Sequence, residues 1–339
     1  MAPSSKSVTE MKILVTGTSG FIGCRLAQIL TELGHEVVAT GRSANSVETD
    51  RVRSLEKLGI RVIEGSLLDP GFAANLVGKC DAVIHLAAAQ HEGNVPDSYF
   101  REVNVEGTRA LIDAAANAGV RRFVYGSTIG IYGSARNGEL DENSPPHPEN
   151  IYGQTKYEAE QVVLQHASKL EICIARISET FGPGDFRLLK LFRAIDRGTF
   201  PMLGSGENLR QVIYVDDLAR GLLLAAEHPA AVGQTFVFAG NEVMTTNTMV
   251  AEIAVALGKG SPRLRIPVWP FRWAAAVCEA IFRPLGLQPP LTQRRLDFFT
   301  KSFVFSTAKY ASMLGFAPRT KFSDGAAITA RWYRENGLL

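Results

Sequence analysis

The sequence predicts an α/β protein with a doubly wound parallel sheet and a smaller, mainly helical C-terminal lobe. In the first half of the chain, short apolar runs rich in β-branched residues alternate with stretches of helical periodicity. Strands that are separated by helices form parallel sheets covered on both faces. The predicted strands are 12–16, 36–40, 61–64, 82–85, 122–125 and 171–177, and helices are predicted over 21–33, 99–118 and 152–169.

The regular alternation fades after residue 177, where a Gly-, Pro- and Phe-rich stretch runs to residue 210. Late strands over 211–215 and 235–239, on either side of a helix over 216–227, are predicted to return to the sheet. We therefore expect a disordered leader (1–10), a sheet domain (11–177 with 211–240) and a substrate lobe (178–210 with 241–339). Ligands bind outside the carboxyl ends of the strands in such sheets, so a cleft is expected between the two parts.

Composition excludes several classes of protein. The 36 Lys/Arg and 34 Asp/Glu residues are dispersed, which argues against a nucleic-acid surface. The four cysteines and six histidines show no ligand spacing, so no metal site is predicted and the cysteines are expected to be mostly buried free thiols. Free thiols favour a reducing, cytoplasmic setting. No uncharged apolar stretch reaches about 18 residues, so no membrane-spanning helix is expected.

A glycine-rich turn joins the first predicted strand to the first predicted helix. Glycines at Gly17, Gly20 and Gly23 allow a tight turn, close approach of a pyrophosphate, and close packing of helix on strand. A glycine triplet can also be a plain turn, but the strand–turn–helix context favours dinucleotide binding. The neighbours expected to line the cofactor site are Ser19, Phe21 and Ile22.

The end of the second strand bears on the choice of cofactor. An acidic residue there would bind the adenosine ribose hydroxyls, but this chain carries Arg42 and Ser43. A guanidinium and a hydroxyl can bind a 2′-phosphate, which predicts NADP in preference to NAD. The alternative is that Arg42 is an ordinary solvated surface residue.

Tyr152 and Lys156 lie four residues apart at the start of a predicted helix, and therefore on one face. A nearby ammonium favours the phenolate of a tyrosine, whose pKa is otherwise about 10. Tyr152 could then exchange a proton with a substrate oxygen while hydride moves to or from the adjoining carbon. The pair predicts a nicotinamide-dependent oxidoreductase, although this spacing alone is common by chance.

Two hydroxyl residues, Ser127 and Thr128, follow the strand predicted over 122–125. At the mouth of the sheet they could orient a reacting carbonyl or alcohol oxygen, or they could simply cap a turn. The order of glycine turn, strand-end hydroxyl and Tyr/Lys helix along the chain favours a catalytic role.

With these motifs, the chain resembles the extended short-chain dehydrogenase/reductase family, of the NAD-dependent epimerase/dehydratase type, from about residue 12 to 336. The resemblance also rests on the segments HLAA at 85–88, NVEGT at 104–108, FGPG at 181–184 and RQVIYVDDLA at 210–219. It implies a Rossmann domain, a small substrate lobe, a homodimer, and Thr128 as the catalytic hydroxyl. It also implies cofactor contacts from Leu86, Ala87, Ala88 and Asn104.

Two departures from the family pattern qualify this resemblance. Ser66 stands where relatives usually carry an adenine-binding Asp, so adenine recognition is expected to rest on backbone groups near Leu67. Ile129 and Gly130 follow Thr128, where dehydratase relatives carry an acid pair. A 4,6-dehydratase is therefore not expected.

Three features bear on the substrate and disagree. By resemblance, Arg210 would hold the diphosphate of a nucleotide sugar. Glu179 occupies a position where such relatives commonly have Asn, and it would repel phosphate unless Arg176 or Arg187 neutralised it. The apolar stretch 268–287 is typical of helical core, and it also resembles the lipid-facing C-terminal region of steroid-type relatives.

We therefore expect an NAD(P)-dependent enzyme that acts by hydride transfer at a ring hydroxyl or keto carbon of a nucleotide sugar, as a 4-keto reductase or an epimerase. The alternatives are a 3β-hydroxysteroid or terpenoid-type dehydrogenase acting on a lipid alcohol, and a catalytically silent cofactor-binding protein. The sequence leaves open which nucleotide, sugar or steroid binds and whether the reaction has net redox.

Overall fold

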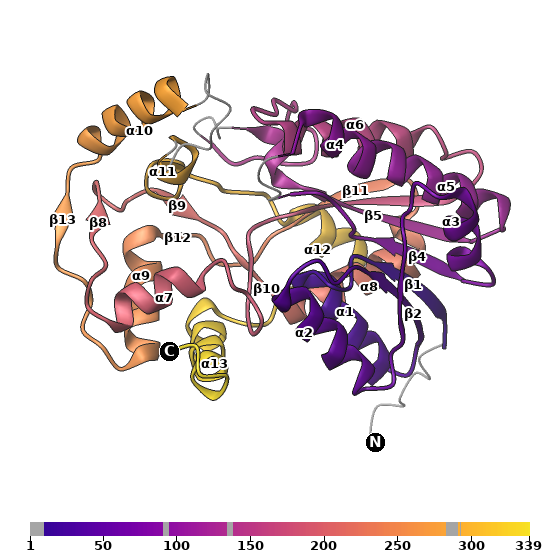
Figure 1. The fold of residues 1–339 in the computed structure, drawn as a ribbon, viewed down its shortest axis with the longest axis horizontal. Coiled ribbons are helices and arrows are strands. Elements are labelled where there is room, and N and C mark those ends of the chain that lie inside the picture. The colour runs from indigo at the N-terminus through magenta and orange to yellow at the C-terminus, as the bar shows by residue number, and fades with distance from the viewer. Residues whose placement is uncertain (1–9, 91–94, 134–137, 283–290, 292) are drawn as a thin grey trace.

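The computed structural model describes residues 10–90, 95–133, 138–282, 291 and 293–339. The leader predicted over residues 1–10 lies outside the described residues, apart from Glu10. Figure 1 shows a twisted sheet flanked by helices and, beside it, a mainly helical part that carries the C-terminus.

Seven parallel strands form the main sheet in the order β11-β6-β5-β4-β1-β2-β3. The order reverses between β1 and β4, which lie next to each other, so the switch point of the sheet lies there. The strands are β1 (Lys12–Thr16), β2 (Glu36–Gly41), β3 (Val62–Glu64), β4 (Ala82–His85), β5 (Arg122–Thr128), β6 (Glu171–Ile177) and β11 (Gln234–Phe238).

Helices cover both faces of this sheet because successive strand residues point to opposite sides. Val15 belongs to the apolar cluster beneath α1 (Phe21–Glu32) and α8 (Val215–Glu227). Leu14 belongs to the opposite cluster. That second face is covered by α3 (Pro70–Val77), α5 (Gly107–Asn117) and α6 (Ile151–Leu164), while α2 (Ser46–Glu56) packs beside α1.

Two predicted helices differ from the observed ones. The helix predicted over 99–118 is α4 (Asp97–Arg101), a π-helical turn (Glu102–Glu106) and α5 in succession. The helix predicted over 152–169 ends at Leu164, because the chain turns back toward β6 there. The π turn holds Asn104, whose role in the site is described below.

The prediction that 211–215 returns to the main sheet is wrong. The observed strand, β10 (Ile213–Tyr214), pairs with β7 (Thr180–Phe181) in a separate two-stranded sheet. The chain enters α8 directly at Val215, and β11 takes the edge position beside β6. The late strand predicted over 235–239 is confirmed as β11.

The second part is mainly helical and has its own apolar core. Phe192, Ile253 and Tyr333 are buried at the centre of that core. Two further two-stranded sheets join β9 (Leu209–Arg210) to β12 (Met244–Thr245) and β8 (Met202–Leu203) to β13 (Arg265–Ile266). The helices of this part are α7 (Leu189–Asp196), α9 (Thr246–Leu257), α10 (Trp269–Phe282), α11 (Gln293–Thr300) and α13 (Phe322–Glu335), and α12 (Ala308–Leu314) lies between α11 and α13 in the chain.

One late segment packs against the main sheet instead of the helical part. Tyr310 of α12 stacks on Phe238 of β11 with ring centroids 5.7 Å apart, and Phe316 packs on both rings. The predicted assignment of residues 178–210 and 241–339 to a separate substrate lobe stays a prediction. The contact of α12 with β11 favours placing α12 with the sheet domain.

Three of the four cysteines are buried, and all four are free thiols. Over the described ranges, no cluster of three or more His, Cys, Asp or Glu residues could hold a metal ion. In the same part of the chain, no helix has both the length and the apolar character needed to cross a bilayer.

Candidate active site

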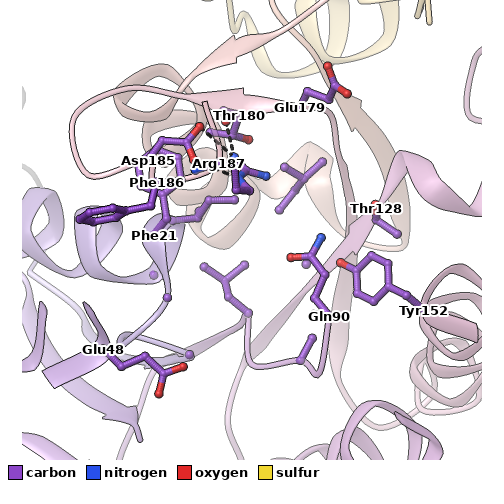
Figure 2. A pocket seen from close by; sticks show the side chains of 18 of the residues that line it. Phe21, Glu48, Gln90, Thr128, Tyr152, Glu179, Thr180, Asp185, Phe186 and Arg187 are labelled. Atoms are coloured by element: carbon purple, nitrogen blue, oxygen red, sulfur yellow. Dashed lines mark hydrogen bonds and ion pairs between the residues drawn. The ribbon is translucent and has the colours of Figure 1, made fainter. Parts of the chain in front are cut away.

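A cavity of about 670 Å³ opens at the carboxyl ends of the central strands. Figure 2 shows Glu48 at one end of it, Thr128 and Tyr152 at the other, and Glu179 and Arg187 along its upper rim. Most predicted site residues line it: Gly17, Gly20, Phe21, Ile22, Gly23, Arg42, Leu86, Ala88, Ser127, Thr128, Tyr152, Lys156 and Glu179. Those predicted but absent from its lining are Ser19, Ser43, Leu67, Ala87, Asn104 and Arg210.

The glycine turn is shaped by close backbone contacts. Gly17 has a φ of +74°, and a Cβ placed there would lie 2.8 Å from the amide nitrogen of Ala87. A Cβ at Gly23 would overlap the carbonyl of Gly17. Gly20 is the N-cap of α1 and offers no side-chain cap, so the first amides of the helix are left for an anion at the positive end of its dipole.

Several predicted cofactor residues hold the loops around this cavity in place through hydrogen bonds. The amides of Leu86 and Ala87 each donate to Oγ1 of Thr16 at 3.1 Å. The Ser19 hydroxyl accepts from the amide of Arg42 at 3.2 Å, which ties the turn to the end of β2.

Asn104, in the π turn, acts in the same indirect way. Its buried amide side chain accepts from the backbone N–H of Ala89 at 2.7 Å and donates to the carbonyl of Ala89 at 3.0 Å. It also donates to Oγ1 of Thr155 at 2.9 Å. Asn104 therefore joins the loop after β4 to α6, the helix that carries Tyr152 and Lys156.

At the end of the cavity expected to hold the adenosine, the structure adds an acidic residue, Glu48, that the sequence analysis did not identify. Arg42 Nη1 donates to the hydroxyl of Tyr99 at 2.8 Å, and its Nε lies 4.0 Å from Oε2 of Glu48. Ser43 donates to Glu64, away from the cavity lining. Glu48 was missed because it lies in α2, beyond the strand end at which an acidic residue is normally sought.

Arg51, one turn further along α2, was also missed. Its guanidinium donates to the carbonyls of Ser19 at 3.1 Å and Gly184 at 2.8 Å, so it bridges the glycine turn and the loop after β7. Burial lowers the pKa of Arg51. The segment between the second and third predicted strands must cross over to a parallel neighbour, commonly as a helix, and Glu48 and Arg51, three residues apart there, could have been identified from that signal.

The catalytic candidates meet where α6 begins. Asn150 caps this helix by accepting from the amide of Gly153 at 3.0 Å. Gly153 packs so closely on the turn after β5 that a Cβ would lie 2.7 Å from the carbonyl oxygen of Gly130. Thr128 Oγ1 accepts from the amide of Gly130 at 3.0 Å, so its hydrogen remains available to donate to a substrate oxygen.

Lys156 is buried, with 2% of its surface exposed, and its ammonium lies 4.1 Å from the centroid of the Tyr125 ring. Burial lowers the pKa of Lys156 to about 7, and the carboxylate of Glu160 offsets part of this effect. Lys156 in the free protein therefore loses its proton far more readily than a lysine in water does. Because the site is desolvated, a negative charge placed near this ammonium would raise its pKa strongly.

A buried ion pair joins α6 to β6. Glu160 accepts from Nε and Nη2 of Arg176 at 3.1 and 2.9 Å, and both side chains are buried. Arg176 also donates to the hydroxyl of Tyr132 and the carbonyl of Glu142, each at 2.9 Å. Burial raises the pKa of Tyr132 to about 12, so it remains a neutral phenol.

Neither of the two arginines that the sequence offered as possible neutralising neighbours of Glu179 forms an ion pair with it. Arg176 is committed to Glu160, and Arg187 pairs with Asp185 at 3.0 Å. Glu179 pairs instead with Arg210, whose Nη1 lies 2.7 and 2.6 Å from its two carboxylate oxygens. Arg210, which was expected to attract a substrate phosphate, and Glu179, which was expected to repel it, thus neutralise each other.

Two buried hydroxyls suggest that the cavity is built for a polar ligand. Within the described part of the chain, Oγ of Ser127 and Oγ of Ser178 are buried and have no hydrogen-bond partner. Both residues line the cavity, at the carboxyl ends of adjacent strands. Ser178 was missed, although a hydroxyl residue directly after the strand 171–177 was a usable signal. Gln90, also missed, extends toward Tyr152 (Figure 2).

A glycine turn for a dinucleotide, a strand-end threonine and a Tyr/Lys helix around one cavity define a nicotinamide-dependent oxidoreductase that works by hydride transfer. The model of the NAD dependent epimerase/dehydratase family matches residues 13–239. The chain belongs to this family.

Curated relatives span nearly the whole chain. A dTDP-glucose 4,6-dehydratase from Streptomyces antibioticus is 28% identical over 96% of this chain and 93% of its own. A 2-alkyl-3-oxoalkanoate reductase from Stenotrophomonas maltophilia is 30% identical over 93% of this chain and 97% of its own. Among solved structures, a dTDP-glucose 4,6-dehydratase from Streptomyces venezuelae with NAD bound is 27% identical, covers 96% of this chain and 98% of its own, and superimposes with a TM-score of 0.75.

Proposed function

We propose that this protein is an NAD(P)-dependent reductase or epimerase that acts at a ring hydroxyl or keto carbon of a nucleotide sugar. The observation that carries the proposal is the position of Thr128, Tyr152 and Lys156 in the cavity that begins at the glycine turn. Relatives named as enzymes of nucleotide-sugar metabolism, with near-complete coverage, support the substrate class.

A nicotinamide cofactor held by the glycine turn of Gly17, Gly20 and Gly23 would supply hydride to the substrate carbon or accept it from that carbon. Tyr152 exchanges a proton with the oxygen on that carbon, while the Thr128 hydroxyl donates to the same oxygen and orients it. Lys156 stabilises the phenolate of Tyr152 electrostatically, since its ammonium is held in a desolvated position four residues along the same helix. Ser127 and Ser178 supply buried hydroxyls to the polar groups of the ligands.

A reductase or epimerase is favoured over a dehydratase. Elimination of water needs an acid and a base beside the reacting hydroxyl, and the residues after Thr128 are Ile129 and Gly130. Ile129 is buried in an apolar cluster with Tyr132 and Phe305. Neither position can carry a proton.

NADP is the proposed cofactor in preference to NAD, on the evidence of Arg42 at the end of β2. Its guanidinium lies at the cavity, where a 2′-phosphate would form charge-assisted hydrogen bonds. Glu48 opposes this preference, because its carboxylate is close to the same guanidinium. The balance between Arg42 and Glu48 is tested in the Discussion.

A second candidate is a dehydrogenase or reductase for an apolar, steroid- or terpenoid-like alcohol. The closed Glu179–Arg210 pair favours it, since neither charge is then available to a substrate phosphate. The Stenotrophomonas relative, named as a reductase of a 2-alkyl-3-oxoalkanoate, supports the same class of substrate.

We also propose a homodimer in a cytoplasmic setting. The family resemblance supports the dimer, and the free thiols support a reducing compartment. Light scattering coupled to gel filtration tests the oligomeric state, and a mass of one chain, 36.8 kDa, would contradict the dimer.

A ligand panel distinguishes the two substrate classes. Thermal shifts with NADP present should show stabilisation by UDP, dTDP or GDP if a nucleotide sugar is the substrate. Stabilisation by sterols or long-chain keto compounds alone would reject the sugar and favour the second candidate.

The catalytic assignment is tested with Tyr152→Phe and a matched control, Tyr157→Phe, one turn along the same helix. Tyr152→Phe should lower kcat by roughly 10²- to 10⁴-fold while cofactor affinity is retained. Tyr157 packs in an apolar cluster, so its substitution should leave kcat nearly unchanged. Equal effects of the two substitutions would remove Tyr152 from the mechanism.

A further inference from the structure

Helix α10 (Trp269–Phe282) exposes a row of large apolar side chains to solvent. Trp269, Trp273, Val277 and Ile281 are 65%, 70%, 53% and 53% exposed. They are spaced four residues apart, so they lie along one side of the helix. We call these four side chains the α10 face.

The opposite side of α10 is the one that packs on the protein. Phe271 and Ala275 lie in a small apolar cluster with Leu203 and Leu296, and Ala275 is the buried residue of the helix. The two charged residues of α10, Arg272 and Glu279, are seven positions apart and therefore share one flank. The α10 face itself carries no charge.

Water is a poor environment for such a face. Two tryptophans and two β-branched residues exposed in a row form a continuous apolar patch, which in soluble proteins marks a contact surface. In Figure 1, α10 lies at the outer edge of the helical part, with α11 below it. The helix spans 14 residues, which is too short to cross a bilayer and long enough to lie along one.

The charge around this helix identifies the kind of surface that it fits. Residues 259–301 contain eight Lys/Arg and two Asp/Glu, whereas the whole chain contains 36 and 34. Lys259 and Lys301 are paired with carboxylates, but Arg263, Arg265 and Arg272, on α10 and just before it, are exposed among the described residues. Tryptophan is enriched at the headgroup level of membranes, where its ring is apolar and its N–H finds a polar partner.

We propose that the α10 face docks this enzyme on the surface of a lipid bilayer that carries anionic headgroups. The apolar side chains insert among the acyl-chain ends and headgroups, and the exposed Arg263, Arg265 and Arg272 are attracted to the lipid charge. The helix lies in the plane of the interface and the sheet remains in water. This proposal is independent of the substrate assignment, because α10 does not line the cavity.

Vesicle co-sedimentation of the full-length protein tests the proposal. The protein should bind vesicles that contain phosphatidylcholine and phosphatidylglycerol, and binding should weaken as salt is added. Replacing Trp269 and Trp273 together with Ser should weaken binding by at least about tenfold, and Arg272→Gln should weaken it by about fivefold. Leu58→Ser and Val255→Ser remove exposed apolar side chains elsewhere and should have no effect.

Tryptophan fluorescence provides a readout that needs no loss-of-binding variant. The chain has three tryptophans, and the third, Trp332, packs edge-to-face on Phe186 inside the protein. Lipids with brominated acyl chains should quench the wild type, and they should quench a larger fraction of the fluorescence of Trp332→Phe, which lacks the unquenched contribution of Trp332. They should not quench the residual fluorescence of a variant with Phe at both 269 and 273.

Two results would overturn the proposal. One is the absence of vesicle binding at low salt together with no quenching in the wild type. The other is a wild-type mass in solution that falls to that of a smaller species when Trp269 and Trp273 are replaced, with no vesicle binding. That result would show that a second copy of the chain covers the α10 face.

Discussion

Glu179 and Arg210 form a closed pair at the rim of the cavity, with both carboxylate oxygens within hydrogen-bond distance of one guanidinium nitrogen. The Glu179 side chain is 47% exposed, whereas that of Arg210 is 1% exposed. Arg210 is also held by the carbonyl of Phe298 at 2.7 Å and by the Phe298 ring 4.2 Å away. Glu179, at the rim of the cavity, is thus held by a buried cation from the helical part.

Glu179→Asn should release the Arg210 guanidinium for an anionic ligand. We expect UDP or dTDP to bind about tenfold more tightly, since a hydrogen bond to a charged group contributes about 1.5–3 kcal/mol. The variant should also lose roughly 2–3 kcal/mol of stability in the ligand-free protein, because the buried Arg210 guanidinium loses its charged partner. Calorimetric titration and thermal unfolding measure both effects. Glu158→Gln, which breaks an exposed pair with Arg101, is the control; unchanged nucleotide affinity in Glu179→Asn would show that Arg210 does not reach the substrate.

Arg42 and Glu48 should set the NADP/NAD preference in opposite directions. Arg42→Asp should weaken NADP binding by roughly 10- to 100-fold and NAD binding much less, because a charge-assisted contact to the 2′-phosphate is lost. Glu48→Gln should strengthen NADP binding a few-fold by removing a nearby negative charge. Titrations with NADP and with NAD, followed by fluorescence, measure the two affinities of each variant and of the wild type. If Arg42→Asp affected both cofactors equally, the guanidinium would not read the 2′-phosphate.

The buried ammonium of Lys156 should make stability depend on pH. Its pKa is about 7 in the folded protein and 10.5 in the reference state, so between these values the unfolded chain binds more protons and wild-type stability rises with pH. Below pH 7 both states are protonated and the full cost of burying the charge remains. Lys156→Met should therefore stabilise the cofactor-free protein at pH 6 by roughly 2–4 kcal/mol, with a smaller gain at pH 9. Denaturant unfolding at both pH values is the measurement, and an equal gain at both would assign it to packing.

The Glu160–Arg176 pair should be essential to stability in a way that an exposed pair on the same helix is not. Glu160→Gln leaves a buried guanidinium without its charged partner and should cost about 3 kcal/mol. Glu158→Gln, at the exposed pair with Arg101, should cost less than about 1 kcal/mol. Urea unfolding compares the two. Similar losses would indicate that Arg176 is sufficiently held by Tyr132 and the carbonyl of Glu142 alone.

The unpartnered hydroxyls of Ser127 and Ser178 should matter for binding and hardly at all for folding. Ser127→Ala and Ser178→Ala should leave the unfolding free energy of the cofactor-free protein within about 0.5 kcal/mol, because no hydrogen bond is lost. Each should weaken ligand binding by about fivefold. Ser144→Ala is the control with the opposite pattern, since its hydroxyl donates to Asp141 at 2.8 Å. Unchanged ligand affinity in both variants would place their hydroxyls outside the contacts to the ligands.

Much of the fold could be predicted because it is encoded locally. The strands at 12–16, 82–85 and 171–177 have the predicted bounds, since a run of β-branched apolar residues flanked by turn residues needs no distant information. The failure at 211–215 has the opposite cause. Which partner a short apolar strand pairs with depends on the edge that is open to it, and β11 takes the edge beside β6.

The candidate site divides in the same way. Gly17, Thr128, Tyr152 and Lys156 could be predicted because each motif is contiguous and lies at the end of a strand or the start of a helix. Asn104 could be placed near the cofactor, but its actual partners, Ala89 and Thr155, lie 15 and 51 residues away. Polar side chains form hydrogen bonds with residues that are distant in the sequence, and a local sequence pattern does not indicate which residues these are.

The sequence by itself determined the parallel sheet and the glycine turn and indicated the candidate catalytic tyrosine, because periodicity and turn chemistry are properties of neighbouring residues. Only the tertiary structure decided that Glu179 is neutralised by Arg210, that Arg176 is committed to Glu160, and that Trp269 and Trp273 face outward. The physical reason is that a charge or an apolar ring acquires its role from what surrounds it. Those surroundings are assembled from distant segments, such as those of Arg210 and Phe298, which are 88 residues apart.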